Sequence, residues 1–267
     1  MRAQQSIPVL MYHHVCPNPG TVTIAPGTFE KQMQWLASHD YTTLTADTLL
    51  GFLRGERSVP ERSVVLTFDD GYLDNYVHAF PILQRFGLHA IIFIVTGWIG
   101  DGPVRVDAGT PNHRACKAAI AGGRADEVML RWAEIEHMEA SGAVEVHSHT
   151  HTHIRWDKQF PDKAQRLDAL QADLKSARHI LRQQLGRPTV HLCWPWGRIE
   201  PGYRELAERV GFQAQYTVAK GVNAAGTDPA RIARMVVKDR AGRWFANRLR
   251  IYGDRRLGAI YTRLRGK

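Results

Sequence analysis

The chain has 267 residues, 44% hydrophobic and 23% charged, which is the balance of a globular protein with a sizeable core. No apolar run approaches the roughly 20 residues of a membrane span, and Pro8 with its polar neighbours interrupts any signal-like stretch at the start. Three scattered cysteines fit a reducing compartment, so we expect a cytoplasmic protein without disulfides.

Apolar strand patterns alternate with amphipathic helix patterns along the chain. We expect strands at 7–15, 63–70, 89–95, 143–150, 189–197, 214–219 and 232–237. Helices are expected at 28–38, where Thr28 would be the cap, and at 76–87, 131–142, 162–186 and 203–211. Continuous apolar strands between helices indicate parallel strands covered by helices. About seven such units predict an α/β fold, a distorted (β/α)7-type barrel of mainly parallel strands, and 100–130 interrupts the rhythm as an insertion or lid.

The strand at 63–70 ends in two adjacent aspartates, Asp69 and Asp70, followed by Gly71. Adjacent side chains within a strand point to opposite faces, so both carboxylates could enter one pocket only where the strand ends. Two close carboxylates repel each other, and one of them then needs a cation or a proton. The pair therefore suggests a metal ligand beside a general base, and the alternative is a surface Asp-Gly turn.

Histidine occupies every second position from residue 147 to residue 153. A pair separated by four residues can meet one metal ion if the chain curls after the strand. Two pairs qualify, His147 with His151 and His149 with His153. All four side chains would lie on one face of an extended strand, so periodicity alone leaves both pairs open. A structural role is the alternative for any single histidine.

These motifs together resemble those of a known enzyme family. "TFDDGY", a His-Thr-x-x-His and the late "WPWG" resemble the polysaccharide deacetylases of the NodB-homology type, carbohydrate esterase family 4. The resemblance runs from "MYHHV" to "YRELAERVGF" and so covers most of the chain. "MYHHV" and "WPWG" are most similar to the poly-N-acetylglucosamine deacetylase branch. The resemblance implies a hydrolase of carbon–nitrogen bonds that removes N-acetyl groups.

The resemblance also implies the roles of the polar residues. It assigns Asp69 as the base and three metal ligands, Asp70, His149 and His153. His147 and His151 would then be structural or touch the ligands. They remain the fallback pair, that is, the alternative pair of histidine ligands for the metal. Two imidazoles and one carboxylate leave open positions on a divalent ion, with Zn²⁺ expected and Co²⁺, Ni²⁺ or Fe²⁺ as alternatives. Such an ion polarises a carbonyl and lowers the pKa of water.

Two positions depart from the common pattern of the family. No histidine follows His191, so the proton for the leaving amine would come from His13, with His14 next, as the poly-N-acetylglucosamine branch implies. The family often has an arginine two residues before its proline, where this chain has Cys193. Arg231 or Arg234 from the last strand could orient Asp69 instead. Three tryptophans could stack on a sugar ring: Trp194, Trp196 and Trp98. For one of Trp194 and Trp196, packing in the core is the alternative.

The net charge of +9 is concentrated at the end of the chain, because residues 231–267 hold twelve Lys or Arg against two Asp. We divide the chain into a catalytic barrel at 1–240 and a basic amphipathic segment at 241–267. This segment could lie on an anionic membrane surface at the inner membrane, or pack its apolar face on the barrel. No nucleic-acid recognition motif supports a nucleic-acid partner.

The sequence therefore predicts a metal-dependent hydrolase whose partner is an N-acetylated saccharide. The substrate would be an amino-sugar polysaccharide or a lipid-linked saccharide, and the product would be acetate. A saccharide-binding protein without catalysis and an O-acetyl esterase are the alternatives, because the same residues could serve either.

Overall fold

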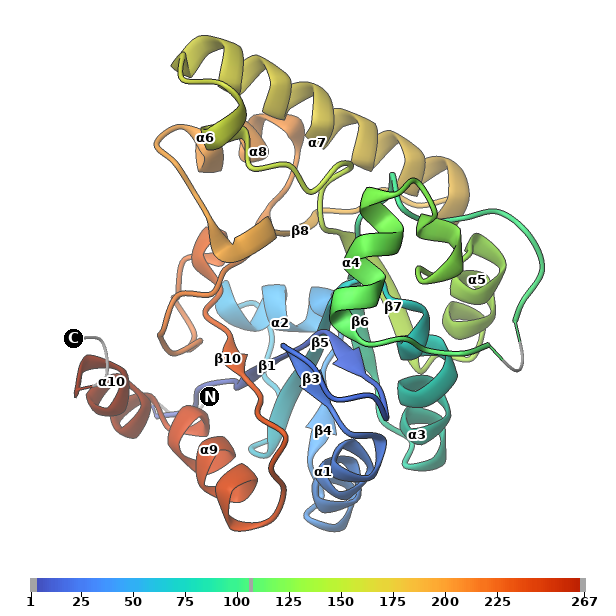
Figure 1. The fold of residues 1–267 in the computed structure, drawn as a ribbon. Coiled ribbons are helices and arrows are strands. Elements are labelled where there is room, and N and C mark those ends of the chain that lie inside the picture. Colours follow the sequence, from blue (N-terminus) through green and yellow to red (C-terminus); the bar gives the residue numbers. More distant parts are fainter. Residues whose placement is uncertain (1–3, 106–107, 265–267) are drawn as a thin grey trace.

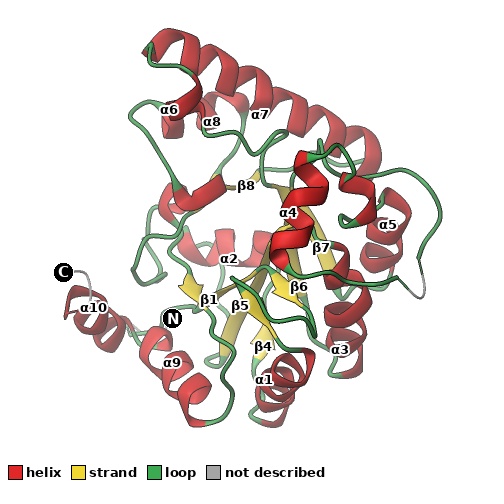
Figure 2. Ribbon diagram, viewed as in Figure 1, coloured by secondary structure: helices red, strands yellow, loops and turns green. Residues whose placement is uncertain are grey.

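A ring of parallel strands surrounded by helices dominates the computed structural model, which describes residues 4–105 and 108–264 (Figures 1 and 2). The strands are β1 (Val9–Tyr12), β2 (His14–Val15), β3 (Thr23–Ile24), β4 (Thr42–Thr43), β5 (Ser63–Asp70), β6 (Ala90–Ile94), β7 (Val144–Ser148), β8 (His191–Cys193), β9 (Ala214–Tyr216) and β10 (Met235–Val236). The α-helices are α1 (Pro26–Ser38), α2 (Ala46–Leu53), α3 (Phe80–Arg85), α4 (His113–Ala121), α5 (Trp132–Ala140), α6 (Trp156–Gln159), α7 (Lys163–Leu185), α8 (Tyr203–Val210), α9 (Arg243–Gly253) and α10 (Arg255–Leu264).

The main sheet has the order β10-β1-β5-β6-β7-β8-β9, and every pairing along it is parallel. The segment that leads into β10 also pairs with β9, through a parallel bridge between Tyr216 and Ile232. This bridge brings the two edges of the sheet together, so the strands form a distorted barrel. The predicted fold class is confirmed, with parallel strands alternating with helices in a single domain.

Side chains alternate between the interior of the barrel and the layer beneath the helices, as the period of two in a strand requires. Leu66 and Phe68 of β5 point outward into the main core, with helices α1, α3, α5 and α9. Val65 points inward, together with side chains from the neighbouring strands. Helix α2 places Leu49, Leu50, Phe52 and Leu53 in this inner cluster. One end of the barrel is therefore filled by packing, which leaves the other end for chemistry.

Several helical features differ from the sequence prediction. Helix α1 begins at Pro26 rather than after Thr28, and its cap, Ala25, makes no side-chain bond. Proline suits the first turn of a helix because its fixed φ matches and its missing N–H would have had no partner there. A π-helical turn at Asn75–Ala79 precedes α3. Helix α2 was not predicted, and α4 lies within the predicted insertion.

The basic C-terminal segment forms two helices with different surroundings. Helix α9 buries Phe245 and Leu249 in the main core. Helix α10 leaves Leu257, Ile260 and Leu264 exposed. Within residues 4–105 and 108–264, none of the helices combines the length and the apolar character needed to cross a bilayer. The division of the chain into two parts at residue 240 stays a prediction. The outer limits of these two parts, residues 1 and 267, lie outside the described residues. Residues 106–107 of the predicted insertion lie outside them as well.

Candidate active site

The two aspartates of β5 both face a cavity at the carboxyl end of the barrel. Asp69 follows the inward alternation of Val65 and Thr67, whereas Asp70 has a φ of 75°, which breaks that alternation. Gly71 follows with a φ of 86°, and a Cβ there would meet Ile94 Cγ2 at 2.9 Å. The backbone turn at the end of the strand thus lets adjacent carboxylates share one site, as the sequence suggested.

Asp70, His149 and His153 converge at this site. Asp70 Oδ1 lies 3.3 Å from His149 Nε2 and 3.4 Å from His153 Nε2. The three ligand atoms lie within 4.8 Å of one another. Asp70 Oδ1 is buried and has no hydrogen-bond partner among the described residues. An orphan carboxylate oxygen facing two imidazole nitrogens fits a divalent cation, because each group can donate a lone pair to one point.

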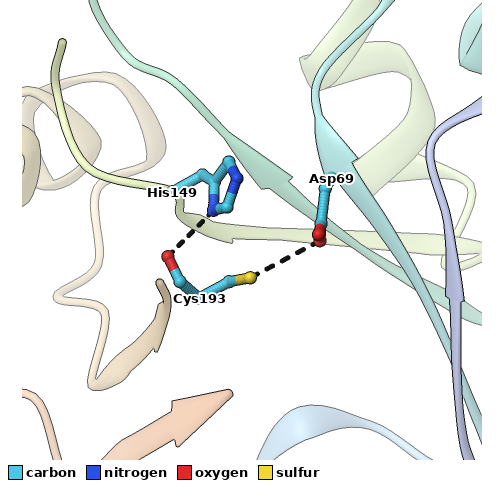
Figure 3. Close-up of side chains that lie close together, drawn as sticks. All are labelled: Asp69, His149 and Cys193. Carbon is cyan, nitrogen blue, oxygen red and sulfur yellow. Dashed lines mark hydrogen bonds between the residues drawn. The ribbon is translucent and has the colours of Figure 1, made fainter. Parts of the chain in front are cut away.

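The tautomer of His149 follows from its hydrogen bond to the chain. His149 Nδ1 lies 2.8 Å from the carbonyl oxygen of Cys193 (Figure 3). A carbonyl only accepts, so Nδ1 carries the hydrogen and donates it. The lone pair of the neutral ring is then on Nε2, which faces Asp70. Bonds of this kind orient metal-binding histidines in proteins.

His153 reaches the site because the chain curls after β7. The φ angles of Thr150 and His153 are 69° and 59°, and the His153 N–H donates to Thr150 Oγ1 at 3.2 Å. Asp173 of α7 fixes the curl, because its carboxylate accepts bonds from the N–H groups of His151 and Thr152 at 3.2 and 2.9 Å. A left-handed backbone at non-glycine residues is strained, and such strain clusters at functional sites.

Arg234 supplies the cation beside Asp69. Its Nη1 and Nη2 donate to Asp69 Oδ1 and Oδ2 at 2.6 and 2.8 Å, and both groups are buried. Arg231, the other candidate, is exposed. Cys193 places its thiol 3.5 Å from Asp69 Oδ1 (Figure 3). Of the two arginines that the sequence offered as partners of Asp69, Arg234 therefore forms the pair, through two hydrogen bonds.

The charges around the site control its protonation states. Burial alone would raise the pKa of Asp69, but Arg234, His149 and His13 together lower the pKa to about 2. Burial would also raise the pKa of Asp70, and the neighbouring imidazoles of His149 and His153 bring that pKa well below its usual range. Burial lowers the pKa of His13, against the opposing effect of Asp69. Both aspartates are thus ionised at neutral pH.

His13 lies beside Asp69 and lines the same cavity as Asp70, His149 and His153. Its Nε2 lies 3.7 Å from Asp69 Oδ2, and its backbone carbonyl accepts a bond from Asn75 Nδ2 at 2.8 Å. The cavity has a volume of about 470 Å³, and His13, Asp69, Asp70, His149 and His153 all line it. The predicted acid, His13, and the predicted base, Asp69, therefore line the same cavity.

Aromatic side chains flank His153 in this cavity. The rings of Trp98 and Trp196 each lie 5.1 Å from the His153 ring. Trp196 is 55% exposed, whereas Trp194 is 2% exposed, stacks on Tyr203 and donates its Nε1–H to Gln215. Trp98 and Trp196 both line the cavity. Trp194 touches its lining but is chiefly a core residue, so for Trp194 the core-packing alternative describes the geometry.

The remaining predicted histidines point elsewhere. His147 lies inside the barrel with Nδ1 2.8 Å from Thr189 Oγ1, and His151 Nδ1 lies 3.0 Å from Thr96 Oγ1. These two do not meet, so the fallback pair is not brought together. His14 is fully buried, with Nδ1 2.5 Å from Asp74 Oδ2 and Nε2 3.1 Å from His113 Nδ1. It joins the first strand to α4 and does not line the cavity.

Sequence reasoning missed residues that shape or line this site. Asp173 lies on the buried face of α7 among Leu170, Leu174 and Ala177. A carboxylate on the apolar face of an amphipathic helix is unusual, and this signal was available in the sequence. His113 and Lys117 line the cavity from α4. Their segment carries no motif that would tie it to the site.

Comparisons with known proteins agree with this geometry. Residues 56–215 match the sequence profile of the polysaccharide deacetylase family. A poly-β-1,6-N-acetyl-D-glucosamine N-deacetylase of Staphylococcus epidermidis is 26% identical over 217 residues, covering 80% of this chain and 67% of that protein. The structure of IcaB from Ammonifex degensii superposes with a TM-score of 0.72 at 26% identity, covering 88% of this chain and 92% of that one.

A deacetylase of Streptococcus pyogenes has the same fold, with a TM-score of 0.74 at 20% identity over 94% of this chain and 99% of that one. The barrel carries, at the carboxyl end of its strands, one aspartate beside two histidines and a second aspartate paired with an arginine. This arrangement and the relatives identify the class of protein as a hydrolase. The chain belongs to the polysaccharide deacetylase family, carbohydrate esterase family 4.

Proposed function

We propose that the protein is a metal-dependent N-deacetylase that releases acetate from an amino-sugar polysaccharide or a lipid-linked saccharide. The observation that carries this proposal is the convergence of Asp70, His149 and His153 beside the Asp69–Arg234 pair in one cavity. The name of the relative in Staphylococcus epidermidis supports an N-acetylglucosamine polymer as the first substrate to test.

The residues divide the reaction between them. Asp70, His149 and His153 would hold a divalent ion, with Zn²⁺ as the first choice and Co²⁺, Ni²⁺ or Fe²⁺ as alternatives. When bound, that ion supplies polarisation of the acetyl carbonyl and a lowered pKa for water. Asp69 accepts the proton of the attacking water, and Arg234 keeps this carboxylate ionised and fixed in direction.

The later steps fall to His13 and to the aromatic side chains that line the cavity. His13 delivers a proton to the amine as the carbon–nitrogen bond breaks, and its 3.7 Å approach to Asp69 lets the two exchange protons through the substrate or a water. A backbone N–H near Trp196 would donate to the developing oxyanion. Trp98 and Trp196 offer flat apolar faces for the C–H surfaces of a sugar.

The decisive experiment measures acetate release by metal-reconstituted protein beside an Asp69→Asn variant. The substrates are poly-N-acetylglucosamine oligomers, chitin oligomers, a lipid-linked N-acetyl sugar and an O-acetyl ester. The proposal expects release from an N-acetylated member by the wild type alone. Release from the ester alone would make the protein an O-acetyl esterase, and silence with metal bound would leave a saccharide-binding protein.

We also propose that residues 241–267 contact an anionic membrane surface. Helix α10 rests on the loop at 220–222, where Gly258 lies so close to Val222 that a Cβ would meet it at 2.4 Å. Its other face exposes Leu257, Ile260 and Leu264. Exposed arginines at 255, 256 and 263 flank these side chains. Apolar residues between arginines suit the interface of an anionic bilayer. The cytoplasmic location stays a prediction.

A further inference from the structure

Helix α4 forms one wall of the active-site cavity. His113, Lys117, Ile120 and Ala121 all line the cavity, and their spacing places them on one face of the helix. Asn112 caps the helix by accepting a bond from the Ala115 N–H at 3.1 Å. Cys116 and Ala119 pack on Tyr72, Val128 and Met129. The helix is therefore anchored on its far side, and its position relative to the site is defined.

Lys117 brings a charge to the mouth of the cavity. Its Nζ lies 5.4 Å from the centroid of the Trp196 ring, and that ring lies 5.1 Å from the ring of His153. The ammonium and the His153 ring therefore both neighbour one indole. Within the described part of the chain, no carboxylate lies within salt-bridge distance of Lys117. An ammonium held over an aromatic face keeps its charge available for a ligand.

The other charges of the lining compensate one another. Arg234 pairs with Asp69 through two hydrogen bonds, and Asp70 faces His149 and His153. A divalent ion at Asp70 would add further positive charge. The ammonium of Lys117 is therefore the charge of the lining that has no partner of opposite sign among the described residues, and it lies at the edge of the cavity.

We propose that Lys117 binds a phosphate group carried by the saccharide, on the part of the substrate next to the sugar whose acetamide reaches Asp69. The inference rests on the proposed deacetylase function and specifies its substrate class as phosphorylated N-acetyl sugars. A single ammonium suits phosphate because it acts as a point charge with three donors. Trp98, Trp196 and Ile120 provide the apolar surfaces for the sugar rings between the two polar ends.

The test compares acetate release from three matched N-acetylglucosamine oligosaccharides. Their reducing ends carry a methyl glycoside, a phosphate, or a phosphate esterified to a short prenyl chain. Metal-reconstituted wild type is measured beside Lys117→Met, Lys117→Arg and Arg114→Gln. Arg114 is an exposed cation on the same helix that does not line the cavity, so it controls for general charge.

We expect the wild type to favour both phosphorylated substrates by about tenfold in kcat/KM, since a hydrogen bond to a charged group has about this value. Lys117→Met should lose this preference through a higher KM for the phosphorylated substrates, whereas Lys117→Arg and Arg114→Gln retain the preference. A further gain from the prenyl chain would identify a lipid-linked phosphate, and its absence a soluble one.

Equal rates on the methyl glycoside and the phosphate would overturn the inference and leave the deacetylase intact. A preference that survives in Lys117→Met would overturn it as well. Silence on all three substrates would instead count against the proposed function, so the two failures can be told apart.

Discussion

The two ends of the barrel interior use the same residue types in different ways. At the end filled by α2, the carboxylate of Glu145 accepts a bond from the Ala46 N–H at 2.5 Å and lies 3.4 Å from His147 Nε2. At the open end, Asp70 faces His149 and His153 across 3.3 and 3.4 Å. Among the described residues, three potential metal ligands come within 4.8 Å of one another only at the open end.

The difference lies in the backbone rather than in the residue types. At the closed end, β7 is extended, so its acid and its histidine lie along one face and serve packing and the start of a helix. At the open end, Asp70, Thr150, His153 and Trp196 all have positive φ. These turns bend side chains from three strand ends toward one point. The function of an alternating histidine therefore depends on whether the chain has left the strand.

The largest effect is expected at Asp69. Asp69→Asn removes the base without touching the metal-binding group, so kcat should fall by about 10³-fold while the metal content is unchanged. Steady-state acetate release and elemental analysis measure the two quantities on the same sample. An Asp69→Asn enzyme with near wild-type kcat would mean that another group is the base.

Removing the guanidinium of Arg234 should harm both stability and activity. Arg234→Gln leaves the buried carboxylate of Asp69 without its arginine, which costs about 3–5 kcal/mol in the free energy of unfolding. Arg234→Lys keeps the charge without the bidentate geometry and should lose less. Denaturant melts are compared with those of Arg231→Gln, an exposed arginine three residues earlier. A loss in Arg231→Gln as large as in Arg234→Gln would contradict the assigned pairing.

The pH dependence tests the same pair. The folded pKa of Asp69 is about 2, below its ordinary 3.8, so its stabilisation is present above pH 3.8 and is lost as the pH falls toward 2. In Arg234→Gln, burial raises this pKa, and the loss should begin at higher pH. The pH at which kcat falls on the acid side of its profile should rise for the same reason. An unchanged acid side of the profile would show that Arg234 does not set the ionisation of the base.

A smaller effect is expected at Asp173, which fixes the curl before His153. Asp173→Ala frees the N–H groups of His151 and Thr152 and should weaken metal affinity by about 10–100-fold. Competition with a chromophoric chelator measures that affinity. Asp168→Ala, an exposed aspartate on the same helix, is the matched control. Equal affinities for the two variants would mean that the curl holds without Asp173.

The smallest effect on chemistry is expected at α10. Replacing Leu257, Ile260 and Leu264 by serine should abolish co-sedimentation with vesicles that contain anionic lipid and leave activity on soluble oligosaccharides unchanged. Val236→Ser, another exposed apolar position at 54% exposure, should bind vesicles as the wild type does. Vesicle binding that survives the triple replacement would refute the membrane proposal.

The sequence predicted the parts of this site that depend on local pattern. The strand ending in Asp69 and Asp70 was readable because Gly71 follows, and the barrel followed from the alternation of strands and helices. Choosing between Arg231 and Arg234 required the register of the last strand. Ile232 and Arg234 share the inward face there, because alternate residues of a strand do so.

Other features depend on contacts between distant segments, which no local pattern encodes. Asp173 reaches the loop after β7 from 21 residues further along the chain, and the carbonyl of Cys193 at the end of β8 orients His149. Helix α4 has a short amphipathic pattern without a motif, so neither Lys117 nor His113 could be tied to the cavity from the sequence.

The most direct measurement of the central claim is the metal content per chain in four single variants, His147→Gln, His149→Gln, His151→Gln and His153→Gln. Each protein is stripped, reconstituted with Zn²⁺, dialysed and analysed for bound metal. We predict one ion per chain in the His147 and His151 variants and none in the His149 and His153 variants. Retention in the His149 and His153 variants, with loss in the other two, would contradict the assignment of the site.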